Sequence, residues 1–148
     1  LCLKAAEKAD INILTRVVDY GGIFHGTMTP NHNFREGDHR TYRPTGWVER
    51  GLERVEKMRP ILSKYDLSEL HFSCLWNLAH GPVRSVVPTF IQEAGEESKA
   101  IEELVKEFGS LQINSPFSDE EIENISNQNL WVGKLRGDSV SRVLFSTV

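Results

Sequence analysis

The apolar residues of the chain follow two different spacings, and each spacing predicts a different kind of element. Residues 11–18 form a run rich in β-branched and aliphatic side chains, which predicts a strand that is apolar on both faces. Residues 83–87 form a second β-branched run, preceded by Gly81 and Pro82 and closed by Pro88, which predicts a shorter strand. Strands that are apolar on both faces are typical of a parallel sheet covered by helices.

Apolar residues three and four positions apart predict the helices. A single apolar stripe that begins near Thr45 predicts a long helix, which Pro60 should kink or end. Ser68 is the expected N-cap of a second helix that is buried on most faces. A third amphipathic helix should end at Gly109 as its C-terminal cap, and a last helix should begin with a capping box at residues 118–121.

The segment between the first strand and the long helix predicts a functional loop. Gly21, Gly22 and Gly26 interrupt the strand pattern, and turn-forming residues continue to about Pro44. Structureless loops longer than about 12–15 residues are uncommon and are usually functional or disordered. Within this loop we expect residues 38–40, Asp-His-Arg, to hold the chain in place by charge-assisted hydrogen bonds.

The order of the predicted elements indicates a parallel α/β fold that is incomplete. A helix over residues 3–8 precedes the first strand, two helices separate the strands, and two more follow. Two parallel strands leave both edges of their sheet unpaired. The chain also opens at Leu1 in a sequence that is typical of the middle of a helix. We therefore expect it to be a piece of a larger protein.

Composition narrows the functional class. The 148 residues are 39% hydrophobic, which excludes disorder for most of the chain, and no apolar run approaches the roughly 20 residues of a membrane span. A formal net charge of −4 argues against general binding of nucleic acid. The two cysteines have no zinc-ligand spacing, so we expect no metal site and a cytoplasmic location.

Five segments together resemble the aldo/keto reductases. Residues 16–26, Arg-Val-Val-Asp-Tyr-Gly-Gly-Ile-Phe-His-Gly, resemble the seventh barrel strand and the following loop of that family. Residues 34–40, 47–60, 75–78 and 85–88 are similar to its later motifs, including the Trp-x-x-x-Gly-Leu-x-x-Val-Glu-x-x-Arg-Pro helix and the eighth strand. Each motif is weak alone, but five in the family's order and spacing are a strong signal, and they cover most of the chain.

The resemblance implies the fold and the activity. It implies the C-terminal portion of a TIM-type (β/α)8 barrel, consisting of its last two strands and the surrounding helices, over residues 1–127. The complete barrel would be an oxidoreductase that uses NADP(H) to reduce a small aldehyde or ketone to an alcohol. Its catalytic Asp, Tyr, Lys and His come from earlier strands, so we expect this segment alone to be inactive. Residues 128–148 are a divergent tail, either a loop that covers the cofactor or non-native sequence after a change of reading frame.

The nicotinamide and pyrophosphate of the cofactor would lie against the first strand and its loop. By resemblance, Arg16 stands at the strand end, where the family packs a residue against the nicotinamide. Val17 and Gly22 fall on the positions whose backbone approaches the pyrophosphate. An alternative for Arg16 is a strand-end charge paired with Asp19.

The adenosine end of the cofactor would lie beyond the second strand. By resemblance, Thr89 and Phe90 face the adenosine 2′-phosphate, and Glu103 matches the acidic residue near the adenine. The arginine expected just before the third amphipathic helix is replaced by Ala100, with Lys99 adjacent. A lysine lacks the bidentate geometry of arginine, so NAD(H) stays open as an alternative to NADP(H).

Several features also have structural explanations. His25, His32 and His39 recur every seven residues, but they lie on a loop without a tight pair, which disfavours a metal site. The arginines of residues 35–59 alternate with glutamates, which predicts a solvated face, and Phe72 and Trp76 are expected in the core. An alternative for the whole chain is a non-catalytic α/β nucleotide-binding or interaction module that self-associates.

Overall fold

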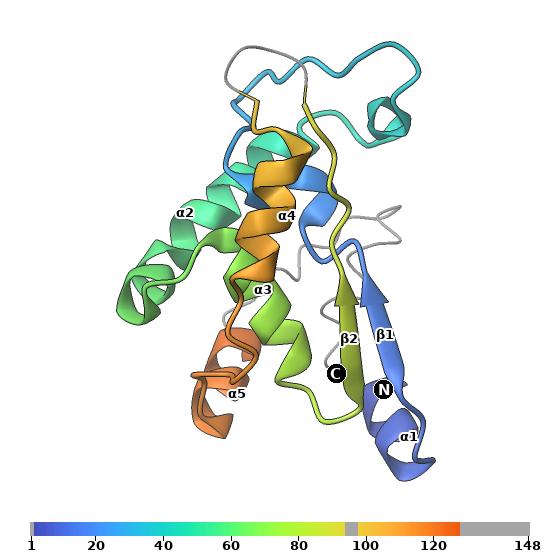
Figure 1. Cartoon of the computed structure of the whole chain (residues 1–148), viewed down its shortest axis with the longest axis vertical. Helices are drawn as coiled ribbons and strands as arrows, with labels where there is room; N and C mark the ends of the chain where they lie inside the picture. Colours follow the sequence, from blue (N-terminus) through green and yellow to red (C-terminus); the bar gives the residue numbers. More distant parts are fainter. Residues whose placement is uncertain (1, 94–97, 128–148) are drawn as a thin grey trace.

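A computed structural model describes residues 2–93 and 98–127 of the chain, and it has a mixed α/β fold (Figure 1). Helices α2, α3 and α4 lie to one side of a pair of strands, whose carboxyl ends point toward the loops at the top of the view. The elements are α1 (Cys2–Lys8), β1 (Ile13–Arg16), η1 (Tyr20–His25), η2 (His39–Tyr42), α2 (Trp47–Tyr65), α3 (Glu69–Leu78), β2 (Val83–Val87), α4 (Ile101–Gly109) and α5 (Asp119–Asn127).

The two strands pair in parallel, as the sequence predicts. Thr15 lies opposite Val86 and Arg16 opposite Val87, and an irregularity between Ile13 and Leu14 shifts the register once. Helices α2 and α3 form the connection between the strands. β1 is shorter than predicted, because the chain leaves the ladder after Arg16.

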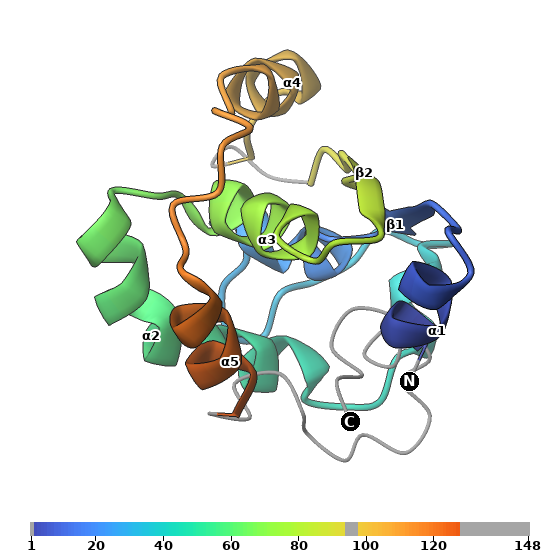
Figure 2. The same cartoon turned by 90° about the horizontal axis from the view of Figure 1, so that it is seen from below.

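The two faces of this sheet differ in their burial, although the sequence predicts a first strand that is apolar on both faces. On one face, Thr15 and Val83 are buried on the side of α3, which lies beside β2 (Figure 2). On the other face, Leu14 is 59% exposed and Val87 is 43% exposed. None of the described elements covers this second face, so its apolar side chains are open to solvent.

The main core lies between η1, α2, α3 and α5. Phe72 and Trp76 are buried in it, as predicted. Of the two outcomes predicted for Pro60, an end of the helix is wrong, because α2 continues to Tyr65. Met58 and Leu62, on either side of the proline, are both buried in this core, so tertiary packing holds the helix together despite the missing backbone hydrogen bond.

The helix ends confirm two of the three predicted caps. The Ser68 hydroxyl accepts from the His71 amide at 3.2 Å, and Ser118 and Glu121 form the reciprocal hydrogen bonds of a capping box. Gly109 is not the left-handed cap of α4, because the helix includes it and ends on Ser110 with φ −85°. The Ser110 amide closes the last turn onto the Lys106 and Glu107 carbonyls without needing glycine.

Two further observations complete the fold. In the described part of the chain, no helix has both the length and the apolar character to span a membrane. The predicted divergent tail, residues 128–148, lies outside the described residues.

Candidate functional site

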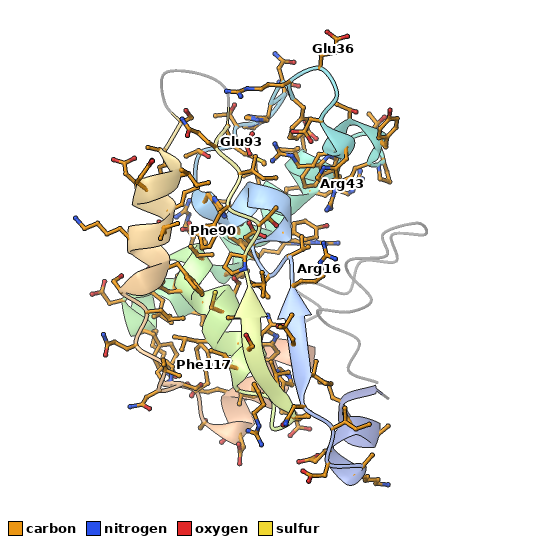
Figure 3. All side chains as sticks on the ribbon, turned by 45° about the vertical axis from the view of Figure 1, so that its right-hand side comes forward. Arg16, Glu36, Arg43, Phe90, Glu93 and Phe117 are labelled. Carbon is orange, nitrogen blue, oxygen red and sulfur yellow. The ribbon has the colours of Figure 1, made fainter. Side chains whose placement is uncertain are left out.

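The candidate site lies where β1 and β2 end side by side. Val17 adopts the left-handed conformation with φ 59°, and its amide donates to the Val87 carbonyl at 2.8 Å. Phe90, just beyond β2, is also left-handed, with φ 46°. Figure 3 labels Arg16 at the carboxyl end of β1 and Phe90 beyond the carboxyl end of β2. Left-handed backbone is unfavourable for a β-branched residue, and such strain is concentrated at functional sites.

A buried carboxylate joins the two strand-end turns. Asp19 is fully buried, and it accepts hydrogen bonds from the Thr89 amide at 2.9 Å and from the Thr89 hydroxyl at 2.7 Å. His25, which is also buried, donates through Nε2 to the same carboxylate at 2.8 Å. We call Asp19, His25 and Thr89 the Asp19 cluster. It fixes the turn after β1 against the turn after β2.

The Asp19 carboxyl stays ionised despite its burial. Burial alone raises its pKa, but the hydrogen bonds from His25 and Thr89 outweigh this effect and hold the pKa below its ordinary value of 3.8. The other ring nitrogen of His25, Nδ1, is buried and has no hydrogen-bond partner among the described residues. The predicted alternative in which Asp19 pairs with Arg16 is wrong, because Asp19 points inward to His25 and Thr89.

A second buried cluster holds the long loop down. The Arg40 guanidinium is 2% exposed, and it donates to Asp38 at 2.6 Å, to Glu93 at 2.5 Å and to the Gly21 carbonyl at 2.9 Å. His32 Nε2 lies 3.2 Å from the Glu93 carboxylate. We call Arg40, Asp38, Glu93 and His32 the Arg40 cluster. Burial alone lowers the pKa of Arg40, but the two carboxylates more than offset this and raise it.

The Arg40 cluster confirms one prediction and corrects two. The expected tie between Asp38 and Arg40 is present, together with a longer contact of 3.8 Å from His39 to Asp38. Arg40 itself is buried, so the prediction of a solvated arginine face is wrong at this position. The loop is also less irregular than predicted, since η1 and η2 lie within it.

Gly22 lies directly beneath the Arg40 cluster. Its φ is +98°, and a β-carbon at this position would lie 3.1 Å from Glu93 Oε1 and 3.2 Å from Arg40 Nη1. Only glycine adopts this backbone without strain and leaves room for both groups. The backbone of Gly22, which the resemblance assigns to the pyrophosphate, is therefore covered by the chain's own carboxylate and guanidinium.

The seven predicted cofactor-binding residues fall into two groups. Arg16, Val17, Thr89 and Phe90 lie at or within three residues of the strand ends, and Gly22 lies in η1, which follows β1. Arg16 is exposed, and within the described ranges its side chain forms no hydrogen bond or ion pair.

The other two predicted residues belong to α4 and its approach. The Lys99 ammonium pairs with Glu107 at 3.1 Å. The Glu103 carboxylate accepts from the Ala100 amide at 3.0 Å and so closes the first turn of α4. Both side chains are therefore already bonded to other residues of this chain. The structure describes residues 98–107, but it does not describe residues 94–97, which precede them.

A groove of about 500 Å³ lies elsewhere, along α2 and the loop that precedes it. Its lining includes Ile23, Leu52 and Val55 together with several glutamates, and none of the seven predicted residues contributes to it. Arg59, which also lines it, already pairs with Glu56 at 2.8 Å and with Glu69 at 3.8 Å. We therefore place the candidate site at the strand ends, where the predicted residues and the left-handed turns meet.

Other candidate chemistry has structural roles. Among the described residues, no three histidine, cysteine or acidic side chains are grouped as a metal site would need. The Tyr65 hydroxyl donates to Glu121, between α2 and α5. Cys74 is buried, and burial raises the pKa of its thiol to about 12, so it is not an activated nucleophile.

The sequence did not lead us to predict that Asp19 joins the two strand-end turns or that Glu93 pairs with Arg40. Asp19 had a usable signal, because it is the one acidic residue in an apolar stretch that runs from Arg16 to Phe24. Glu93 lay in a polar loop with other glutamates and had no such signal.

Comparisons with known proteins do not assign the chain to a family. No family model matches the sequence, no curated protein matches it, and no solved structure matches the fold. The functional interpretation therefore depends on the residues and the geometry of the strand ends.

Proposed function

We propose that this chain is the C-terminal, cofactor-binding part of an NAD(P)H-dependent aldo/keto reductase, and that the complete protein reduces an aldehyde or ketone to an alcohol. The observation that carries the proposal is the parallel pairing of β1 with β2, which brings the motifs at residues 16–26 and 85–88 side by side. Ligands of α/β proteins bind beyond the carboxyl ends of parallel strands. The exposed Arg16 and the two left-handed turns lie at that edge.

The bare face of the sheet supports a larger barrel. In a barrel, alternate residues of each strand point into the interior, where side chains from the other strands bury them. Leu14, Arg16, Ser85 and Val87 are exposed on this face, and they would point into the interior of a complete barrel. Further strands would both cover these side chains and pair the free edges of β1 and β2.

The residues at the strand ends fit the nicotinamide end of a dinucleotide. The bound cofactor supplies the hydride, and the protein supplies binding, orientation and electrostatics. The planar Arg16 guanidinium can stack on an aromatic ring and has no competing partner among the described residues. The Asp19 cluster holds the two turns in place before any ligand arrives, which lowers the entropy cost of binding.

Replacing Arg16 tests this proposal. In the full-length protein, Arg16→Ala should weaken NADPH binding by on the order of tenfold, since it removes a stacked cation from an aromatic ring. A matched control is Arg84→Ala, because Arg84 is also an exposed arginine of the sheet but bonds to Asn12 near the opposite strand ends. Titration of intrinsic fluorescence measures both affinities. Unchanged affinity in the Arg16 variant would remove Arg16 from the site.

A second candidate function is self-association as a non-catalytic module. Exposed apolar side chains favour it, namely Leu14 and Val87 on the sheet and Val105, 51% exposed, on α4. Size-exclusion chromatography of the 148-residue chain separates the two candidates. A discrete dimer that unfolds cooperatively would support the module, whereas aggregation would support the barrel segment. We expect no reductase activity from this chain alone, and measured turnover would contradict that.

A further inference from the structure

The segment that follows β2 carries an excess of negative charge. Its described residues, 88–93 and 98–107, contain four glutamates, two lysines and no arginine, which is a formal net charge of −2. In dinucleotide sites, an arginine accommodates the 2′-phosphate of NADP, whereas an acidic side chain accepts a hydrogen bond from the 2′-hydroxyl of NAD. The charge of this segment therefore suits an unphosphorylated ribose.

The donors at Thr89 are not free to bind a phosphate. Its amide and its hydroxyl both donate to Asp19, at 2.9 and 2.7 Å. The pKa of Asp19 is below its ordinary value, so this carboxylate is ionised at neutral pH. A 2′-phosphate that took these donors would leave a buried anion without partners and would itself lie close to that anion, and both effects are unfavourable.

The N-terminal turn of α4 is likewise satisfied by the chain's own carboxylates. Glu103 accepts from the Ala100 amide, and Glu102 adds a second exposed charge to the same turn. Lys99, just before the helix, pairs with Glu107 at 3.1 Å. A phosphate at this turn would have to compete with Glu107 for Lys99 while lying against two glutamates. The donors at Thr89 and at the N-terminal turn of α4 therefore do not fit a 2′-phosphate.

We infer that the proposed site takes a nicotinamide dinucleotide with a free 2′-hydroxyl, NAD(H), in preference to NADP(H). The inference rests on the proposed function. Ala100 is the specificity-determining position, because it lies at the N-cap of α4, beside Lys99, and its methyl group offers no donor to a phosphate. An arginine at this position would add the bidentate donor that the segment lacks.

The experiment compares the two cofactors on the full-length protein. Quenching of intrinsic tryptophan fluorescence at fixed ionic strength gives the dissociation constants of NAD⁺ and NADP⁺. We expect NAD⁺ to bind tighter by roughly tenfold or more. Ala100→Arg should strengthen binding of NADP⁺ by about tenfold and leave NAD⁺ nearly unchanged. The control Asn114→Arg adds the same charge in the exposed loop after α4 and should alter neither constant.

The outcomes separate this inference from the proposed function. Wild-type protein that binds NADP⁺ as tightly as NAD⁺, or more tightly, would overturn the inference and leave the proposed function in place. Protein that binds neither dinucleotide would overturn the proposed function itself. An Ala100→Arg variant with no gain for NADP⁺ would overturn the assignment of Ala100 as the specificity-determining position.

Discussion

The Asp19 cluster and the Arg40 cluster join the same two loops, but they balance charge differently. In the Asp19 cluster, one buried carboxylate accepts from three donors supplied by Thr89 and His25. In the Arg40 cluster, one buried guanidinium is shared between the carboxylates of Asp38 and Glu93. The first cluster therefore depends on hydrogen bonds to an anion, whereas the second depends on a cation between two anions.

This difference determines what remains when the central residue of each cluster is removed. Loss of Arg40 leaves Glu93 as a buried carboxylate without its cation, which is a large penalty. Loss of the Asp19 charge weakens or removes the hydrogen bonds from Thr89 and His25, and uncharged donors cost less to leave unsatisfied than a buried charge. The Arg40 cluster should therefore be the more sensitive of the two to substitution.

The largest expected effect comes from Arg40→Ala. We expect a loss of about 3–5 kcal/mol in the free energy of unfolding, as is typical when one partner of a buried ion pair is removed. Urea denaturation measures the loss. The matched control is Arg59→Ala, which removes an exposed pair with Glu56 and should have little effect. Equal losses in the two variants would show that the Arg40 cluster does not behave as a buried ion pair.

Asp19→Asn should have a smaller effect, about 1.5–3 kcal/mol, because hydrogen bonds to a charged acceptor become weaker or are lost. Thr89→Val, which removes the hydroxyl but keeps the amide hydrogen bond, should cost only about 1 kcal/mol. The same urea series ranks all three variants. The comparison between clusters would be reversed if Asp19→Asn cost more than Arg40→Ala.

Gly22→Ala tests how closely the Arg40 cluster packs on the backbone. Left-handed backbone costs alanine about 1–2 kcal/mol, and the β-carbon would also crowd Glu93 and Arg40. Gly37→Ala is the matched control, because Gly37 has φ +81° but its β-carbon would meet nothing within 4 Å. Thermal unfolding should therefore show a larger loss at Gly22 than at Gly37. Equal losses of stability in the two variants would mean that the Arg40 cluster shifts to accommodate the methyl group without cost.

The smallest expected effect is the loss of unfolding free energy at acidic pH. The hydrogen bond from Arg40 lowers the pKa of Asp38, and the pKa of Asp19 is also lowered, both from an ordinary value of 3.8. A carboxyl with a lowered folded pKa stabilises the fold above its ordinary pKa, and this stabilisation is lost as the pH falls through the folded value. The unfolding free energy should therefore fall below about pH 4. A pH series of urea denaturations should show a smaller fall in unfolding free energy for Asp19→Asn than for the unchanged protein. An identical fall in both proteins would contradict the lowered pKa of Asp19.

The sequence predicted correctly those strands and helix caps that depend on neighbouring residues. Residues 83–87 are a strand as expected, and Ser68 and Ser118 cap their helices, because a side chain and an amide three residues away form such caps. The predicted helix end at Pro60 and the predicted cap at Gly109 are wrong for the opposite reason. Burial of Met58 and Leu62 outweighs the proline, and the Ser110 amide reaches two carbonyls without a left-handed glycine.

The candidate site was only partly predictable. The family resemblance pointed to Arg16 and Thr89, which lie at the ends of adjacent strands. It did not reveal that Thr89 is bonded to Asp19, 70 positions away, or that Arg40 binds Glu93, 53 positions away. No spacing rule connects residues this far apart in the sequence, because their contact depends on how the strands pair.

The periodic pattern and the turn residues therefore established the kind and order of the elements, since helix and strand spacing is a property of neighbouring residues. Tertiary structure decided which charges became buried. The parallel pairing of β1 and β2 buries Asp19, Arg40 and Glu93. Once buried, each of these charged groups needs hydrogen-bonding partners within the protein. Burial and pairing at a distance arise only when the chain is packed, so the charge balance of this site is a property of the fold.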